Sequence, residues 1–124
     1  MQPRALISVV DDDVSSRESL PDLLQMLGFV TKSFASAEDF LASESLSETQ
    51  CLLLDVSMPD GMSGPQLQCE LNRRDLKIPI IFITADCNQE LRAELLARGA
   101  VECLFKPFSE HDLRLALDRV VDAA

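Results

Sequence analysis

Aromatic and basic side chains are scarce in this sequence. Tryptophan and tyrosine are absent and six phenylalanines supply all the aromatic content, so the core must be built mostly from aliphatic side chains. Only 11 lysines and arginines stand against 21 aspartates and glutamates, for a formal net charge of -10. A surface this acidic repels phosphate backbones and anionic lipids, but it suits a divalent cation or a basic partner. We expect no direct binding to nucleic acid or membrane by this segment.

Long hydrophobic runs and paired cysteines are also lacking. No apolar stretch is long enough to cross a membrane, and nothing resembles a signal peptide. The cysteines at 51, 69, 87 and 103 form no C-x-x-C pair, so they do not have the spacing of a zinc or redox site. We therefore expect a cytoplasmic location, with four free thiols. The 124 residues suit one domain, spanning 1–124, that can bury a core without disulfides.

Short apolar runs alternate with amphipathic stretches along the chain. The predicted strands are Ala5–Val10, Val30–Phe34, Cys51–Leu54, Ile78–Ile83 and Val101–Phe105. The predicted helices are Ser15–Leu27, Ser36–Ala42, Pro65–Arg74, Asn88–Arg98 and Ser109–Asp122. Ser15 and Glu18 have capping-box spacing at the first of these. Five β-α repeats predict an α/β fold, with a parallel sheet covered by helices on both faces.

Polar residues stand at the ends of four of the apolar runs. They are Asp11, Asp12 and Asp13 after the first run, Asp55 after the third, Thr84 after the fourth and Lys106 after the fifth. In open parallel α/β sheets, ligands bind along the edge formed by the carboxyl ends of the strands. We therefore expect these residues, from four distant parts of the chain, to converge on one site.

The residue types in this set suit phosphoryl transfer. Carboxylate oxygens are ligands for Mg²⁺, and a carboxylate can also attack phosphorus to give an aspartyl phosphate. A metal ion, a lysine ammonium and a hydroxyl such as that of Thr84 can neutralise or bind the phosphoryl oxygens. Each residue alone has a simpler structural role, as a helix cap, a strand-end hydroxyl or a surface charge. All of them in order, each at a strand end, favour the chemical interpretation.

The sequence resembles the receiver domain of bacterial two-component response regulators over essentially its whole length. The matching segments are VVDDD (9–13), LLLDVSMPDGMSG (52–64), IIFITA (80–85) and FKPF (105–108). The segments SAEDFL and GAVECLFKPF are most similar to FixJ-like regulators. The resemblance implies a flavodoxin-like three-layer fold, with a five-stranded parallel sheet in the order 2-1-3-4-5 and five helices.

The resemblance also implies a role for each site residue. Asp55 is the expected phospho-acceptor, and Thr84 and Lys106 are expected to contact the phosphoryl group. The Lys106–Pro107 peptide bond is expected to be cis. Asp86, two residues after Thr84, is expected to lie beside the path of the water that hydrolyses the phosphoryl group.

A Mg²⁺ site is implied in the same way. Asp11 and Asp12 form the acidic pair of the family, with Asp12 favoured as the direct ligand. Asp55 and the backbone carbonyl of Ser57 complete the protein's share of the coordination. The side chain of Ser57 is expected to lie beside the path of the hydrolytic water.

The implied function is signal transduction. A sensor histidine kinase gives its phosphoryl group to Asp55, and the chain then switches a partner or output surface. Transcription control through an output domain beyond Ala124 is expected by analogy, with a stand-alone receiver as the alternative. A homodimer through the fourth helix, fifth strand and fifth helix is a further expected interaction. No enzymatic activity is expected beyond self-catalysed, Mg²⁺-dependent phosphoryl transfer to Asp55 and its hydrolysis.

Two features depart from the family pattern. The segment DVSMPDGMSG (55–64) is one residue longer, through an extra glycine. Cys103 stands where the family usually has the tyrosine or phenylalanine that rotates as a switch. Either Phe105 or Leu104 takes over that role, or Thr84 and the loop before it carry the coupling alone.

Three rival interpretations remain at this point. A haloacid-dehalogenase phosphatase also forms an aspartyl phosphate, but it needs an acid where this chain has Ser57, and it needs a cap domain. A flavodoxin-type nucleotide carrier shares the fold, but the acidic segment after the first strand would repel a phosphate. A degenerate receiver that is never phosphorylated conflicts with the complete set of acids, threonine and lysine, and only Cys103 favours it.

Overall fold

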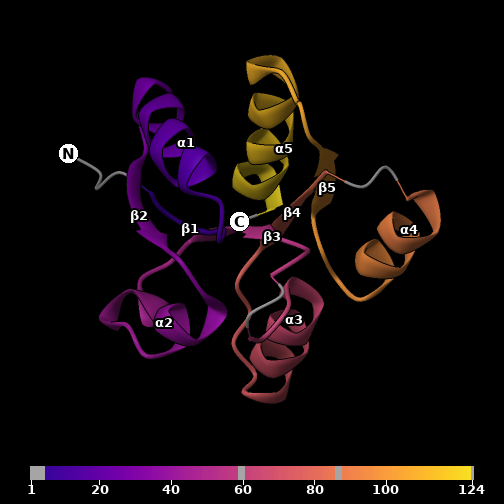
Figure 1. The fold of residues 1–124 in the computed structure, drawn as a ribbon. Coiled ribbons are helices and arrows are strands. Elements are labelled where there is room, and N and C mark those ends of the chain that lie inside the picture. The colour runs from indigo at the N-terminus through magenta and orange to yellow at the C-terminus, as the bar shows by residue number, and fades with distance from the viewer. Residues whose placement is uncertain (1–4, 59–60, 86–87, 124) are drawn as a thin grey trace.

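A computed structural model describes residues 5–58, 61–85 and 88–123. The strands are β1 (Leu6–Val10), β2 (Val30–Phe34), β3 (Cys51–Asp55), β4 (Ile80–Thr84) and β5 (Glu102–Phe105). The helices are α1 (Val14–Met26), α2 (Ala37–Leu41), α3 (Gly64–Arg73), α4 (Gln89–Ala97) and α5 (Glu110–Ala123). The strands pair in parallel in the order β2-β1-β3-β4-β5 (Figure 1). The predicted flavodoxin-like fold and strand order are therefore confirmed.

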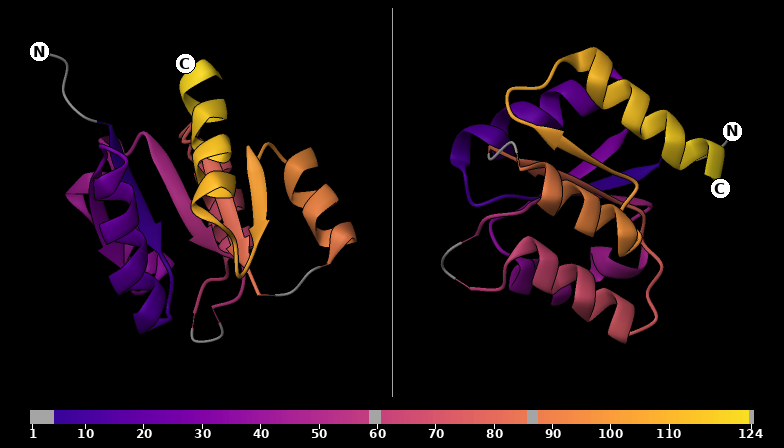
Figure 2. Two further views of the ribbon diagram at one scale, coloured as in Figure 1. Left: turned by 90° about the horizontal axis from the view of Figure 1, so that it is seen from above. Right: turned by 90° about the vertical axis from the view of Figure 1, so that its right-hand side faces the viewer.

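The sheet separates two helical layers. Helices α1 and α5 lie on one face, and α2, α3 and α4 lie on the other (Figures 1 and 2). Successive strand residues point to opposite faces, so each strand contributes to two cores. In β3, Leu53 packs in the cluster under α1 and α5, whereas Leu52 and Leu54 pack under α2 and α3. The aliphatic core expected from the composition is divided in this way between the two faces.

Burial along the strands follows their place in the sheet. All five residues of β3, and all five of β4, are buried, because these strands have a neighbour on each side and a helical layer on each face. In β2, at the edge of the sheet, every described side chain is exposed or only partly buried. This contrast explains why CLLL and IIFI are continuous apolar runs while VTKSF carries polar residues.

The structure corrects the predicted start of the first helix. Asp13 is the N-cap of α1, and its carboxylate accepts the Ser15 backbone N–H at 3.0 Å. The helix therefore begins one residue before the proposed Ser15–Glu18 capping box. A reciprocal capping box is instead found at α3, between Ser63 and Gln66. Both caps follow the same principle, since each provides oxygens for backbone N–H groups that lack a partner in the first helical turn.

Two further features complete the fold. A 3-10 turn that the sequence did not predict follows α2, over Glu44–Ser47. Gly28 has a φ of 99°, which suits the C-terminal stop predicted after the first helix. No helix in the described part of the chain is both long enough and apolar enough to cross a membrane.

Candidate functional site

The parallel register brings the carboxyl ends of the strands together at one edge of the sheet. Asp55 lies beside Ile83 in the β3–β4 pair, and Thr84 lies beside Phe105 in the β4–β5 pair. The backbone N–H of Lys106 donates to the Thr84 carbonyl at 2.7 Å. Residues from β3, β4 and the segment after β5 therefore meet at this edge, as the sequence predicts.

Three carboxylates cluster at this edge. Asp11, Asp12 and Asp55 each offer an oxygen within 4.8 Å of the others. Asp11 and Asp55 are buried, whereas Asp12 is exposed. Three hard oxygen donors with one side open to water fit a small divalent cation, which usually keeps several waters. The set could therefore hold the metal ion predicted from the sequence.

Asp55 lies in an environment that opposes its negative charge. Burial, a hydrogen bond with the Asp11 side chain and repulsion from the Asp11 charge raise the pKa of Asp55 to about 7. Two weaker effects act the other way, namely attraction to Lys106 and the Ser57 backbone N–H, which donates to Asp55 Oδ1 at 3.2 Å. This last contact places the Ser57 backbone beside Asp55. The role of its carbonyl in binding metal stays a prediction.

Lys106 is bound on the α1 side of the site. Its Nζ donates to Asp11 Oδ2 at 3.0 Å and to Ser16 Oγ at 3.2 Å. The other oxygen of Asp11 accepts the Asp13 backbone N–H at 2.9 Å. Among the described residues Lys106 forms its ion pair with Asp11 and none with Asp55. The ammonium is thus close enough to influence the charge of Asp55 without pairing with it.

The strand-end threonine and the peptide bond after the lysine lie as expected. Thr84 is buried at the end of β4. The Lys106–Pro107 bond is cis. The predicted site residues Asp11, Asp12, Asp55, Ser57, Thr84 and Lys106 all lie at this edge. Asp86 lies outside the described residues.

Sequence reasoning missed two residues that shape the site. Ser16 contacts Lys106 across 90 positions of the chain, and no local pattern indicates that contact. Gly64 begins α3 directly against β3, where an added Cβ would lie 2.3 Å from the Asp55 carbonyl oxygen. The sequence signals for Gly64 are its place one residue before Pro65, at a helix start, and its place at the end of the matching segment 52–64, and neither shows the close approach to β3.

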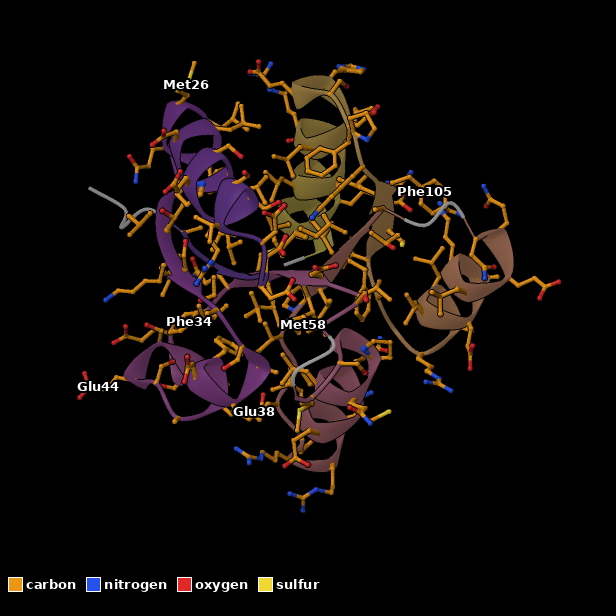
Figure 3. All side chains as sticks on the ribbon, in the orientation of Figure 1. Met26, Phe34, Glu38, Glu44, Met58 and Phe105 are labelled. Atoms are coloured by element: carbon orange, nitrogen blue, oxygen red, sulfur yellow. The ribbon has the colours of Figure 1, made fainter. Side chains whose placement is uncertain are left out.

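The longer loop after β3 contacts α2. Glu38 Oε2 accepts the Met62 backbone N–H at 3.1 Å, and Gly61 has a φ of 141°. Figure 3 shows Glu38 reaching from α2 toward this segment. Pro59 and Asp60, within the same loop, lie outside the described residues. Gly61 thus lies where this loop meets α2.

Comparison with known proteins identifies the family. A sequence profile of the response regulator receiver domain matches residues 7–118. The chain belongs to this family. The receiver domain is 42% identical over 120 residues to nodulation protein W of Bradyrhizobium diazoefficiens, with 97% of this chain and 51% of that protein covered. It is 39% identical over 107 residues to the transcriptional regulatory protein TdiR of Thauera aromatica, with 86% and 47% covered.

The structural comparison agrees. The crystal structure of FixJ-N matches the receiver domain with a TM-score of 0.86 and 34% identity, and 100% of this chain and 98% of that chain are covered. The predicted similarity to FixJ-like regulators is confirmed. The chain spans about half the length of the curated relatives named above. These alignments therefore describe the receiver domain of this chain and no other part of the relatives.

Cys103, which stands at the expected switch position, is a core residue. Cys103 is buried, and burial raises the pKa of its thiol. It lies in the apolar cluster under α2, α3 and α4, and Phe105 packs at the border of that same cluster. Leu104 packs in the cluster on the opposite face of the sheet. Of the two substitutes considered for the missing aromatic, only Phe105 shares the face of Cys103.

An ion-pair network joins α4, β5 and α5 next to Cys103. Glu102 Oε1 accepts from Arg92 of α4 at 2.6 Å and from the Cys103 backbone N–H at 2.9 Å. Glu102 Oε2 accepts from Arg119 of α5 at 2.8 Å. We call these three charged residues the Glu102 triad. It connects the three elements of the predicted dimer face.

Proposed function

We propose that Asp55 accepts a phosphoryl group from a sensor histidine kinase and that this event switches an output surface of the receiver domain. One observation carries the proposal. A buried carboxylate at a strand end lies within 4.8 Å of two further carboxylates, and a lysine is anchored beside it. A structural role alone gives no reason to crowd three acids in this way.

The proposed transfer needs positioning and charge neutralisation. An Asp55 carboxylate oxygen forms a bond to phosphorus while the bond from phosphorus to the donor's histidine nitrogen breaks. Lys106 and Thr84 bind the phosphoryl oxygens. Asp11, Asp12, Asp55 and the Ser57 carbonyl would hold Mg²⁺, which supplies positive charge for those oxygens when it is bound. Because the cation also favours the charged form of Asp55, it makes the nucleophile available at neutral pH.

The chemistry proposed here is self-modification rather than turnover of a separate substrate. Hydrolysis of the aspartyl phosphate returns Asp55 to its starting state. Ser57 is placed beside Asp55 by its backbone contact, which supports a role for its side chain near the hydrolytic water. Substituting Ser57 or Asp86 should therefore change the phosphoryl half-life more than the stability of the fold.

The wider setting is proposed by analogy with the relatives. Residues 1–124 form one receiver domain in the cytoplasm, and an output domain beyond Ala124 controls transcription. The name of TdiR, a transcriptional regulatory protein of about twice the matched length, supports this proposal. The Glu102 triad lies on the face proposed to dimerise when Asp55 is phosphorylated, and Cys103 is buried directly beneath it.

The assignment of Asp55 is tested by covalent labelling. Acetyl phosphate with Mg²⁺ should add one acid-labile phosphoryl group, detected by intact mass and located by peptide mapping. Asp55→Asn should abolish labelling. Asp22→Asn, at an exposed position of α1, is the matched control and should label normally. Labelling of the Asp55→Asn variant at another residue would overturn the proposal.

Self-association is tested by sedimentation with and without beryllofluoride, a mimic of the phosphoryl group. We expect dimers to form on activation, more weakly than in relatives with an aromatic at position 103, because a thiol cannot fill an aromatic-sized space. Dimerisation and phosphorylation share one coupling free energy, so each should favour the other. If the wild type stays monomeric in both states and Cys103→Phe dimerises on activation, the switch has been lost in this chain.

A further inference from the structure

The ammonium of Lys106 is held by a hydroxyl that belongs to α1. Ser16 Oγ lies 3.2 Å from Lys106 Nζ and 3.4 Å from Oδ2 of Asp13, the helix N-cap. A serine hydroxyl has one proton to donate and lone pairs that accept. An ammonium can only donate and a carboxylate can only accept. The hydroxyl must therefore accept from Lys106, which leaves its own proton for Asp13.

This arrangement favours one direction of the Ser16 hydroxyl, with its lone pairs toward Lys106. Asp13 is itself held as the N-cap, because its Oδ1 accepts the Ser15 backbone N–H. The first turn of α1 thus presents an acceptor to Lys106, next to the Asp11 carboxylate that pairs with the same ammonium. Lys106 is therefore fixed to the α1 side of the site by two oxygens.

We propose that Ser16 is a positioning residue that holds Lys106 away from Asp55 in the unphosphorylated protein and so slows phosphorylation. This inference rests on the function proposed above, in which Lys106 binds the phosphoryl group on Asp55. Within the described residues the Lys106 ammonium pairs with Asp11 and not with Asp55, so in this proposal it exchanges its contact with Ser16 for one with the incoming phosphoryl group. An interaction that is stronger in the ground state than in the transition state raises the barrier.

The proposal predicts a different effect on the two steps of the cycle. Phosphorylation starts with Lys106 bound to Ser16 and should become faster when the hydroxyl is removed. Hydrolysis starts and proceeds with Lys106 on the phosphoryl group, so its rate should not change. One charge-assisted hydrogen bond at a site that water can reach corresponds to roughly a three- to tenfold change in rate. A general destabilisation of α1 gives no reason for the phosphorylation rate to rise while the hydrolysis rate stays the same.

The chain provides a matched control within the same hollow. Ser16, Ser19 and Lys106 line one surface hollow of about 510 Å³ between α1 and the segment after β5. Ser19 lies one turn along α1 and donates instead to the Ser15 carbonyl at 2.8 Å. Removing the Ser19 hydroxyl changes the same surface but leaves the contact with Lys106 intact.

The test compares valine and threonine at position 16, because these side chains have the same shape and differ by a hydroxyl. Phosphorylation by acetyl phosphate with Mg²⁺ and loss of the label after donor removal are both followed by intact mass. Ser16→Val should be phosphorylated about three to ten times faster than wild type. Ser16→Thr and Ser19→Ala should match wild type, and all four half-lives should agree. Ser16→Ala repeats the test if the valine variant unfolds.

The possible outcomes separate this inference from the function on which it rests. A wild type without label on Asp55 defeats the proposed function itself. A labelled wild type with Ser16→Val and Ser16→Ala at or below its rate overturns only the role of Ser16. The same conclusion follows if threonine accelerates labelling as much as valine does, because the hydroxyl is then irrelevant.

Discussion

Asp55 and Glu102 are both acids with little exposure, but their neighbours differ in sign. Asp55, 7% exposed, lies against the Asp11 carboxylate, and its charged form is disfavoured. The Glu102 side chain, 12% exposed, lies between Arg92 and Arg119 and also accepts a backbone N–H. At the edge of the sheet, therefore, the fold tolerates unfavourable electrostatics that a cation can relieve. At the face of β5 it uses complete pairing to join two helices.

The largest expected effect comes from removing the cation from the Asp55 site. Without a divalent ion, an incoming phosphoryl group adds its negative charge to three crowded carboxylates. We expect EDTA to slow phosphorylation by acetyl phosphate on the order of a hundredfold or more, the scale of losing a preorganised electrostatic partner. Mg²⁺ or Mn²⁺ in excess should restore the rate, and EDTA already saturated with Mg²⁺ is the control. A rate indifferent to chelator would remove the metal from the proposal.

The next effect is a pH-dependent instability at Asp55. Its pKa is raised from 3.8 to about 7 in the folded protein, so the folded state holds this proton more tightly than the unfolded state does. The destabilisation of the folded state by ionised Asp55 is therefore absent below pH 3.8. It grows as the pH rises to about 7 and is constant above that. With a discount for screening by nearby water, we expect Asp55→Asn to gain roughly 1–3 kcal/mol of unfolding free energy at pH 8.

This stability difference can be measured by urea unfolding at pH 5 and pH 8 in metal-free buffer. The gain from Asp55→Asn should be larger at pH 8, since the wild type is penalised there. Asp22→Asn, at an exposed position on α1, should change the free energy of unfolding by no more than about 0.5 kcal/mol at either pH. Equal stabilities of wild type and Asp55→Asn at pH 8 would show that the two regions do not differ in the way described.

The smallest expected effect is at the Glu102 triad. Glu102→Gln removes the negative charge that pairs with two arginines but keeps an oxygen for the Cys103 N–H. Because both arginine side chains reach water and can be hydrated, we expect the free energy of unfolding to fall by only about 1 kcal/mol. Glu94→Gln, in an exposed pair with Arg98 on α4, is the control and should cost less than about 0.5 kcal/mol. Equal losses in urea unfolding would mean that the triad is no stronger than a surface pair.

The sequence predicted the parts of the site that interrupt a regular pattern. Asp55, Thr84 and Lys106 were found because each is a polar residue at the end of an apolar run, and the ends of parallel strands meet at one edge. The strand order came from the family resemblance and is confirmed. The continuous burial of β3 and β4 follows from CLLL and IIFI, since central strands are covered on both faces.

The missed features depend on contacts between distant or competing groups. Ser15 and Asp13 are both residue types that can cap a helix, and spacing alone did not show that the Asp13 carboxylate is the cap and that α1 starts one residue earlier. The hydrogen bond from Lys106 to Ser16 connects residues 90 positions apart, and it depends on how α1 packs against the segment after β5. The network around Glu102 depends in the same way on the distance between α4 and α5.

The contact between Gly64 and β3 has a consequence for which substitutions the chain can accept. At Gly28 an added Cβ meets nothing within 4 Å, so the strain of any substitution there comes only from the backbone φ of 99°, and asparagine is the least unfavourable replacement. At Gly64 the obstacle is lack of space, since even the methyl group of alanine would overlap the Asp55 carbonyl. Among all possible codons at position 64, only those for glycine should survive a selection for signalling. Tolerance at this position should be as low as at Asp55, although Gly64 brings no side chain to the chemistry.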